Sequence, residues 1–298
     1  MADPRLTPAR PDLAARFLEG KVEAARFVDG VAHEVIAAAA PLRRAPAHDA
    51  ALDTEALKGE RVTVYDRREG WAWGQLVNDG YVGWLPDALL AAPGPTPTHK
   101  VAALRTFAFP GPSIKLPPVS TLSLGAALAV TRIDGDFAIT REGHHIPTRH
   151  VVPFDHRASD FVAVAETFAG TPYLWGGKTS LGIDCSGLVQ VSLTAAGIGA
   201  PRDSDMQQGA LGAEVPLSEI GRIERGDLIF WKGHVAIARD AESLIHANAF
   251  HMATTIEPTR EALSRIKTAG SEVVTIKRLW DNCRHPPPPY PPPQAGEG

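Results

Sequence analysis

The chain of 298 residues is long enough for about two or three domains, and its 44% hydrophobic and 21% charged residues are typical of a globular protein. Its formal net charge is −4 at pH 7, and the sequence contains no run of basic residues. Nucleic acids and anionic membrane surfaces bind to basic surfaces, so this composition argues against both as partners.

The first twenty residues are polar and include Pro4, Pro8 and Pro11. A secretory signal needs a continuous apolar core, and a membrane span needs about eighteen apolar residues in a row. The sequence shows neither pattern. Its two cysteines, Cys185 and Cys283, are too few for a disulfide framework or a four-cysteine zinc site. We therefore expect a cytoplasmic protein.

Apolar residues near the start of the chain have helical spacing, and we expect an N-terminal helical segment over residues 1–32. The period changes over residues 33–92. Alternating apolar residues at 61–65 and 71–77, then an Asn-Asp-Gly turn and an apolar run at 81–86, predict short strands. Short strands joined by turns are typical of a small β-barrel.

The ordered glycines and tryptophans of this barrel resemble those of the bacterial SH3-like domain. The matching segments are Gly59-Glu60, Trp71-Ala72-Trp73 and Gly80-Tyr81-Val82-Gly83-Trp84-Leu85. A stiff Pro-rich linker follows at 93–97. Strand-like runs over 99–153, with a hairpin turn at 134–136, predict a second, degenerate SH3-like barrel without the tryptophans.

From residue 154 the pattern becomes that of an α+β domain, which we assign to residues 154–284. Helical spacing predicts helices at 158–168 and 184–196, the second ending at Gly197. The strand candidates that follow are 227–231, 234–239, 243–247 and 272–279. The Pro-rich tail at 285–298 is expected to be extended or disordered and to have no catalytic role.

Cys185 lies where a predicted loop enters the second of these helices. The backbone N–H groups and the positive end of the helix dipole at such a position should lower the pKa of the thiol, and the thiolate is the form that attacks a carbonyl. Asp184 is expected to cap the helix, and beside the nucleophile it is also a candidate for binding a substrate amine. An arbitrary cysteine more often fills a small hole in a core, so this assignment depends on the surrounding motifs.

Five ordered motifs surround Cys185. They are Thr171-Pro172-Tyr173-Leu174-Trp175-Gly176-Gly177, Gly182-Ile183-Asp184-Cys185-Ser186-Gly187-Leu188, Gly226-Asp227-Leu228-Ile229-Phe230, Gly233-His234-Val235-Ala236-Ile237 and Leu244-Ile245-His246-Ala247. At these residues the segment from about 158 to 280 resembles the NlpC family of papain-like cysteine peptidases. The resemblance implies an α+β fold with a papain-like catalytic domain preceded by two small SH3-like β-barrels.

The same resemblance implies catalytic roles. Cys185 would be the nucleophile, His234 the general base that takes its proton, and His246 the partner that fixes the tautomer of His234. Tyr173 corresponds to a family tyrosine whose hydroxyl, with the backbone N–H of Cys185, would stabilise the oxyanion. The plainer alternatives are half-buried strand histidines, a core aromatic for Tyr173, and simple packing for Trp175.

For substrate, the resemblance implies a murein-derived peptide cut at the bond between γ-D-Glu and diaminopimelate or lysine. Members with SH3-like domains before the catalytic domain often require a free N-terminal L-Ala and release L-Ala-γ-D-Glu. A buried ammonium needs a carboxylate partner. The candidates are Asp203, helped by Ser204, and Glu60 in the first barrel. Tyr81 is a candidate for an aromatic wall and Arg202 for binding a substrate carboxylate. A solvated loop charge explains Asp203 equally well, and ordinary barrel positions explain Tyr81 and Glu60 better.

Two other functions stay open at this point. One is an amidase or acyltransferase with the same Cys/His chemistry, although the sequence shows no obvious source of an apolar groove. The other is a murein-binding module with an inert catalytic domain, against which the intact set of Cys185, His234 and His246 argues. No metal or other cofactor is implied, because these three residues fit a nucleophile and its base better than a metal site. The sequence does not indicate an oligomeric state.

Overall fold

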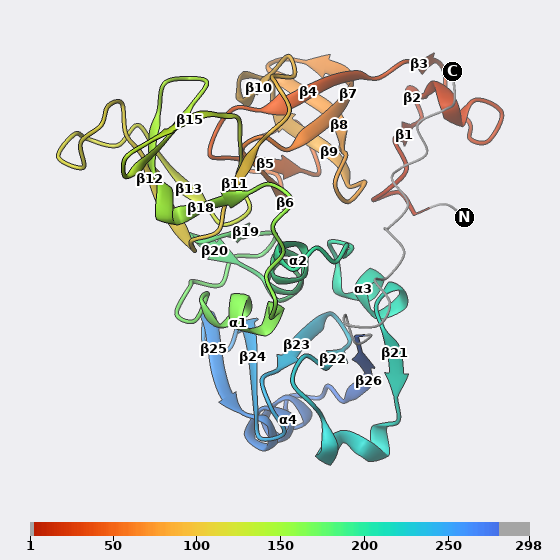
Figure 1. Ribbon diagram of the computed structural model, residues 1–298. Coiled ribbons are helices and arrows are strands. Elements are labelled where there is room, and N and C mark those ends of the chain that lie inside the picture. The colour runs from red at the N-terminus through yellow and green to blue at the C-terminus, as the bar shows by residue number, and fades with distance from the viewer. Residues whose placement is uncertain (1–2, 280–298) are drawn as a thin grey trace. The chain divides into compact units, whose positions relative to one another are not determined.

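The computed structural model describes residues 3–279, and Figure 1 shows the order of their helices and strands. The predicted Pro-rich tail at 285–298 and the end of the predicted catalytic domain lie outside the described residues. The chain divides into two compact units between His156 and Arg157, close to the predicted boundary at residue 154. No helix within residues 3–279 is long and apolar enough to cross a membrane.

The first barrel of the first unit is a seven-stranded antiparallel sheet in the order β10-β4-β7-β8-β9-β5-β6. Its strands are β4 (Val31–Val35), β5 (Ala39–Arg43), β6 (Leu52–Leu57), β7 (Arg61–Arg68), β8 (Trp71–Leu76), β9 (Val82–Pro86) and β10 (Leu90–Ala91), with the 3-10 helix η2 (Asp87–Leu89) before β10. The predicted strands at 61–65, 71–77 and 81–86 are therefore confirmed.

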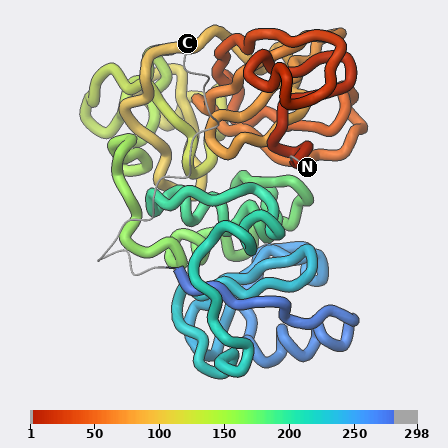
Figure 2. The backbone as a smooth tube through the Cα atoms, turned by 90° about the vertical axis from the view of Figure 1, so that its right-hand side faces the viewer, coloured from red at the N-terminus to blue at the C-terminus, as the bar shows by residue number. Residues whose placement is uncertain are grey.

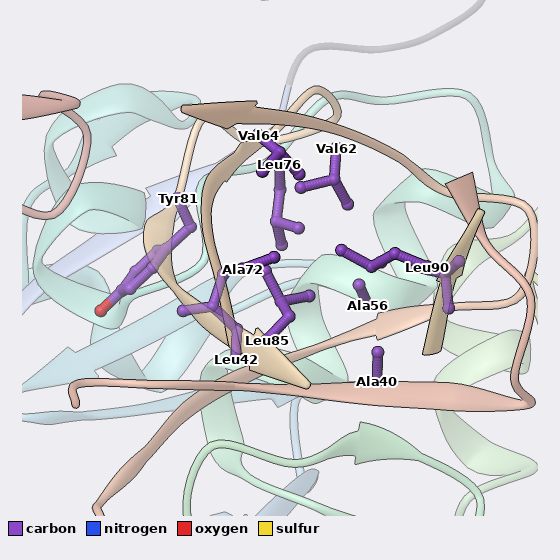
Figure 3. Packing of buried hydrophobic residues seen from close by; sticks show 11 residues of the cluster. Ala40, Leu42, Ala56, Val62, Val64, Ala72, Leu76, Tyr81, Leu85 and Leu90 are labelled. Atoms are coloured by element: carbon purple, nitrogen blue, oxygen red, sulfur yellow. The ribbon is translucent and has the colours of Figure 1, made fainter. Parts of the chain in front are cut away.

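Alternation along these strands separates a core face from an outer face. In β7, Val62 and Val64 are buried while their neighbours are only half-buried. Figure 3 shows Val62, Leu76 and Leu85 pointing into one shared core, which holds the strands together through burial of apolar area.

The helical segment predicted over residues 1–32 is wrong. Its described part contains β1 (Ala9–Arg10), β2 (Leu13–Ala15), the 3-10 helix η1 (Arg16–Leu18) and β3 (Phe27–Val28). Leu13 is fully buried beside Trp71, Trp73 and Trp84, and the Arg10 guanidinium lies 4.3 Å from the ring of Trp73. Figure 2 shows this segment, in red, alongside the orange strands of the barrel. Packing on the tryptophan face overrides the weak helical spacing, and the early prolines oppose a helix as well.

The second barrel of this unit is built from three small antiparallel sheets, in the orders β14-β11-β18, β12-β13 and β15-β16-β17. Its elements are β11 (His99–Val101), β12 (Arg105–Ala108), β13 (Ser120–Ser123), β14 (Ala127–Leu128), β15 (Val130–Asp134), β16 (Phe137–Thr140), β17 (His145–Pro147), η3 (Thr148–His150) and β18 (Val151–Pro153). The hairpin β15–β16 closes at the predicted turn, where Asp134 pairs with Phe137. Aliphatic side chains, among them Leu122 and Ile146, form its core without a tryptophan.

The second unit contains a six-stranded antiparallel sheet in the order β21-β26-β22-β23-β24-β25. Its strands are β21 (Ala213–Val215), β22 (Leu228–Trp231), β23 (His234–Ala238), β24 (Ser243–Asn248), β25 (Ala253–Pro258) and β26 (Val273–Arg278). A two-stranded sheet of β19 (Lys178–Thr179) and β20 (Gly182–Ile183) directly precedes the helix that starts at Cys185. The four strands predicted in this region are confirmed, whereas β21 and β25 were not predicted.

Four helices accompany this sheet in the described residues. They are α1 (Phe161–Glu166), α2 (Cys185–Ala195), α3 (Ser204–Ala210) and α4 (Thr259–Thr268), with the 3-10 helix η4 (Leu217–Arg222). Helix α2 packs against β23, β24 and α1, as Figure 1 shows, and α4 packs against β25. Both predicted helices are present, and Gly197 adopts the positive φ of 79° that the predicted end of α2 requires. Helices α3 and α4 were not predicted.

Candidate active site

Cys185 is the first residue of α2, as the sequence predicts. The backbone N–H groups of Ser186 and Val235 are directed toward its thiol and act to lower the thiol pKa. Val235 belongs to β23 and directly follows His234, so the nucleophile lies beside the start of that strand. The helix start and the strand together therefore bring Cys185 to the predicted base.

Asp184 holds this helix start in place. Its Oδ1 accepts a 2.7 Å hydrogen bond from the N–H of Gly187, which makes it the N-cap, and its Oδ2 accepts one of 2.8 Å from the N–H of Gly176. The Arg202 guanidinium binds both oxygens, at 2.9 and 2.7 Å. A Cβ at Gly187 would lie 2.4 Å from the carbonyl oxygen of Gly177, so this close approach requires a glycine.

This network corrects two predictions about substrate binding. Asp184 is 7% exposed and both of its oxygens are engaged within the unit, so its carboxylate is used to build the site rather than to bind a substrate amine. The side chain of Arg202 is fully buried and also donates to Ser186 Oγ and the Gly177 carbonyl. It therefore pairs with Asp184, not with a substrate carboxylate.

The predicted lowering of the thiol pKa is also wrong in direction. Burial, together with the nearby Asp184 carboxylate, raises the pKa of Cys185 to about 12. The two backbone N–H groups and the charge of Arg202 act in the opposite direction but are outweighed. The thiol is only 7% exposed, so the cost of removing a thiolate from water exceeds the favourable effect of the helix start.

The two predicted histidines lie on neighbouring strands and contact each other. Nε2 of His234 is 2.8 Å from Nδ1 of His246. His246 is fully buried and His234 is half-buried. Burial, followed by the neighbouring imidazole, lowers the pKa of His234 to about 3, and burial also lowers the pKa of His246. Both rings are therefore neutral at pH 7.

A carboxylate that the sequence analysis missed completes this chain of contacts. Oε1 of Glu257 lies 2.6 Å from Nε2 of His246, and Arg265 forms an ion pair with the same oxygen. In the β24–β25 pair His246 faces Thr255, and Glu257 follows two residues later on the same face. The β-branched run Thr254-Thr255-Ile256 was the available signal for this strand.

Tyr173 is held next to the nucleophile's helix start. It forms a parallel bridge with Ile183, two residues before Cys185, and its N–H donates to the Met252 carbonyl. Burial, together with charge at Cys185 and Asp184, raises the pKa of Tyr173 to about 12. Its hydroxyl therefore stays protonated at neutral pH and able to donate, although its role at the oxyanion stays a prediction. Trp175 is 67% exposed, which corrects the expectation that it packs inside.

Asp203 and Ser204 stand at the start of α3, and both are half-buried. Asp203 occupies the N-cap position, but its side chain makes no capping hydrogen bond. The buried amide of Gln207 in α3 donates to the carbonyls of Ser186 and Pro201, each at 2.9 Å. These bonds tie the start of α3 to the first turn of α2, so Asp203 and Ser204 belong to the surroundings of the nucleophile.

Tyr81 and Glu60 lie in the first unit. Tyr81 is 4% exposed and packs in the core of the first barrel, at the margin of the cluster in Figure 3. Glu60 is half-buried in the turn before β7. Their proposed contributions to substrate binding stay predictions.

Within residues 3–279, there is no group of three or more His, Cys, Asp or Glu side chains that could hold a metal ion. What the site holds is a thiol, two neutral imidazoles in series, a carboxylate and a protonated tyrosine. These groups can perform nucleophilic attack on a carbonyl with proton transfer through an imidazole.

Known proteins show the same two kinds of domain. The model of the bacterial dipeptidyl-peptidase SH3 domain matches residues 42–90, and that of the NlpC/P60 family matches residues 170–271. A protein of Escherichia coli named probable endopeptidase NlpC is 32% identical over 111 residues, which are 32% of this chain and 70% of that protein. The chain belongs to the NlpC/P60 family. The predicted family, papain-like fold and SH3-like domain are thereby confirmed.

Other NlpC/P60 relatives cover more of the chain. The γ-D-glutamyl-L-lysine dipeptidyl-peptidase of Bacillus cereus is 28% identical over 228 residues, 66% of this chain and 67% of that protein. Dipeptidyl-peptidase 6 of Lysinibacillus sphaericus is 39% identical over 89 residues, and the match spans only 31% of its length. A crystal structure of an NlpC/P60 family protein from Bacillus cereus has the same fold, with a TM-score of 0.70 at 22% identity over 84% of this chain and 100% of that one.

Proposed function

We propose that this NlpC/P60 protein is a cysteine peptidase that cuts free murein stem peptides between γ-D-Glu and the diamino acid, diaminopimelate or lysine. Its substrate carries an unblocked N-terminal L-Ala, and its product is L-Ala-γ-D-Glu. The observation that carries the proposal is that Cys185 starts α2, which packs against β23 and β24, and that these strands carry His234 and His246 with their rings bonded to each other. The relatives named γ-D-glutamyl-L-lysine dipeptidyl-peptidase support the substrate class.

The acylation step starts from a neutral thiol and a neutral imidazole. Nε2 of His234 is engaged by His246, so Nδ1 is the nitrogen that takes the Cys185 proton. The attraction between the thiolate and imidazolium so formed offsets part of the cost of two buried charges. Sγ then bonds to the γ-carbonyl carbon of D-Glu and forms a tetrahedral oxyanion.

The rest of the cycle returns the proton. Imidazolium His234 gives it to the leaving amine of the diamino acid as the C–N bond breaks, leaving a thioester on Cys185. Water, losing a proton to His234, then attacks the thioester, and the thiol regains its proton as the dipeptide leaves. The Tyr173 hydroxyl, which stays protonated because its pKa is raised to about 12, is the proposed side-chain donor to the oxyanion of both steps.

Selection of a free amine requires a carboxylate close to the nucleophile. Asp184 is committed to the helix cap and Arg202, whereas Asp203 is half-buried at the start of α3, which Gln207 ties to the first turn of α2. We assign Asp203 to the substrate ammonium, with Ser204 beside it as a hydrogen-bonding group.

Cleavage of defined peptides tests this proposal. L-Ala-γ-D-Glu-diaminopimelate and its lysine counterpart should each be assayed by mass spectrometry, with and without an N-acetyl group. We expect L-Ala-γ-D-Glu only from the unblocked peptides, no product with Cys185→Ala, and full activity with Cys283→Ala as the matched control. Equal digestion of polymeric sacculus, or of acetylated peptide, would contradict the requirement for a free L-Ala.

The same assay separates the two alternatives left open by the sequence. An acyltransferase would convert the thioester into a new amide when a competing amine is added, so hydrolysis product would fall as the amide appears. An inert murein-binding module would bind the peptide without releasing product. The proposed peptidase releases the dipeptide at the same rate with and without the competing amine.

The expected cytoplasmic location is likewise a proposal, which fractionation of cells that produce the protein would test.

A further inference from the structure

A continuous line of polar contacts leads from the base to a positive charge. His234 Nε2 lies 2.8 Å from His246 Nδ1, and His246 Nε2 lies 2.6 Å from Glu257 Oε1. Arg265, on α4, pairs with that same oxygen. We call this line of four side chains the histidine relay. Its outer members, Glu257 and Arg265, touch neither Cys185 nor any group that reacts.

The charge state of Glu257 decides how protons are placed along the relay. Burial disfavours its ionised form, but the hydrogen bond and charge of His246 and the charges of Arg265 and His251 outweigh burial and lower its pKa. An ionised carboxylate has no proton to donate and can only accept. The nitrogen of His246 that faces Glu257 must therefore carry a proton.

The proton positions then follow one after another. A neutral imidazole carries a proton on one nitrogen only, so His246, protonated at Nε2, presents an unprotonated Nδ1. His234 must donate to that nitrogen through its own Nε2–H. Nδ1 of His234 is then left unprotonated, which is the form required to take the thiol proton. With the opposite tautomer, Nδ1 of His234 would carry a proton and could not act as the base.

We propose that Glu257 is a positioning residue that, through His246, sets the tautomer of the base His234. Arg265 keeps Glu257 ionised and turned toward the relay. The charged groups that face the two rings are Glu257 on β25, Arg265 on α4, Asp184 before α2 and His251 in the β24–β25 loop. Of these, Glu257 alone is hydrogen-bonded to a relay histidine. The effect of Glu257 on catalysis rests on the proposed peptidase function. The positions of the protons on the two histidines do not depend on that function.

The proton positions can be measured without substrate. The intact protein, labelled with 15N in its histidines, should show in wild type a proton on Nε2 of both His234 and His246, with the signals assigned from His234→Gln and His246→Gln spectra. In Glu257→Gln the amide can either accept from or donate to Nε2, so we expect a mixture of tautomers at both rings. Wild-type protein with the proton on Nδ1 of His234 would overturn the proposal, whatever the variants do.

Activity gives the second measurement. Outer-shell partners of metal-bound histidines typically contribute about 10- to 100-fold, and by analogy we expect kcat with Glu257→Gln to fall by about that factor with KM little changed. Glu257→Asp, which keeps the charge, should restore the wild-type tautomer and part of kcat. Glu166→Gln is the matched control, since it breaks a comparable Glu–Arg pair with Arg239 in the same unit. It should leave tautomers and kcat unchanged.

Two results distinguish failure of this proposal from failure of the proposed function. Loss of activity in Glu257→Gln with wild-type tautomers retained would overturn the role of Glu257. Wild-type protein that shows the expected tautomers but cleaves no murein peptide would support the relay and refute the substrate assignment.

Discussion

Two helix starts in the second unit carry an aspartate at the same position and use it differently. Asp184 caps α2, binds Arg202 through both oxygens and is buried. Asp203 stands before α3 without capping it, although it directly follows Arg202 in the chain. The comparison shows that residue type and position do not determine what a carboxylate does. Because the buried guanidinium of Arg202 binds both of its oxygens, Asp184 has a structural role in the site.

A third helix start lies between these two extremes. Asp160 caps α1 by accepting from the N–H groups of Val162 and Ala163, and it pairs with Arg225 at 2.8 Å. Its side chain is 41% exposed, so water and salt weaken the ion pair. The three aspartates therefore form a series: Asp184 is a buried cap, Asp160 is an exposed cap, and the side chain of Asp203 does not cap its helix. Substitutions at each should separate structural from functional roles.

The largest effect is expected from Asp184→Ala. The change leaves the fully buried side chain of Arg202 without its carboxylate, which should lower the free energy of unfolding by about 3–5 kcal/mol in urea denaturation. Replacing both partners with apolar residues, Asp184→Leu with Arg202→Met, should cost less than the single change. The loss of an N-cap alone lowers the free energy of unfolding by about 1 kcal/mol. A smaller decrease in Asp184→Ala would mean that the pair with Arg202 adds nothing, which would remove the contrast with Asp203.

Asp203→Ala should affect the substrate rather than the fold. We expect the free energy of unfolding to fall by less than in Asp184→Ala, because Asp203 is half-buried rather than buried. The KM for the unblocked tripeptide should rise about tenfold or more, equivalent to about 1.4 kcal/mol of binding. Asp205→Ala, in the first turn of the same helix, is the control and should leave KM unchanged. A destabilised protein with normal KM would make Asp203 a second structural cap.

Asp160→Ala should cost about 1 kcal/mol, the usual contribution of an N-cap. Burial opposes its ionised form, but Arg225 and the capping N–H groups lower the pKa of Asp160 below 3.8. A lowered pKa stabilises the folded protein above the unfolded-state pKa, and this contribution is lost as the pH falls through the folded-state value. The difference in unfolding free energy between wild type and variant should therefore shrink below about pH 4. A difference that stays constant down to pH 2 would exclude this origin.

The smallest effect concerns the reactivity of Cys185. Because the pKa of its thiol is raised, alkylation by iodoacetamide should be slow at mildly acidic pH and should accelerate as the pH rises. Asp184→Asn removes a charge that raises this pKa, so the thiol pKa should fall and alkylation should become severalfold faster at a fixed pH. Asp203→Asn should not change the rate, and Cys185→Ala accounts for reaction at Cys283. A wild-type rate already at its plateau near pH 5 would mean that the thiolate–imidazolium pair exists at rest.

Much of the site could be predicted because local patterns determine it. The start of α2 at Cys185 follows from the capping aspartate and the helical spacing behind it. His234 and His246 contact each other because successive antiparallel strands lie side by side, and both strands were recognisable from their apolar runs. Gly197 marked the end of the helix through its backbone conformation.

The remaining features depend on long-range packing. Asp184 pairs with Arg202, 18 positions later, and from the sequence alone Arg202 was also a candidate for binding a substrate carboxylate. Glu257 reaches His246 only because of the register of the β24–β25 pair. The direction of the Cys185 pKa shift depends on how deeply the thiol is buried, and the N-terminal strands form because a tryptophan face is present to cover. Neither depth nor partner surface can be inferred from local spacing.

The three strands that carry the relay also imply an order of folding. His234, His246 and Glu257 lie on consecutive strands, and successive partners are 12 and 11 positions apart in the sequence. Contacts this close in sequence have a low loop-closure cost, and proteins rich in such contacts fold fast. The proton-handling half of the site can thus assemble as one β-meander, and α2 then delivers the nucleophile to a base that is already oriented.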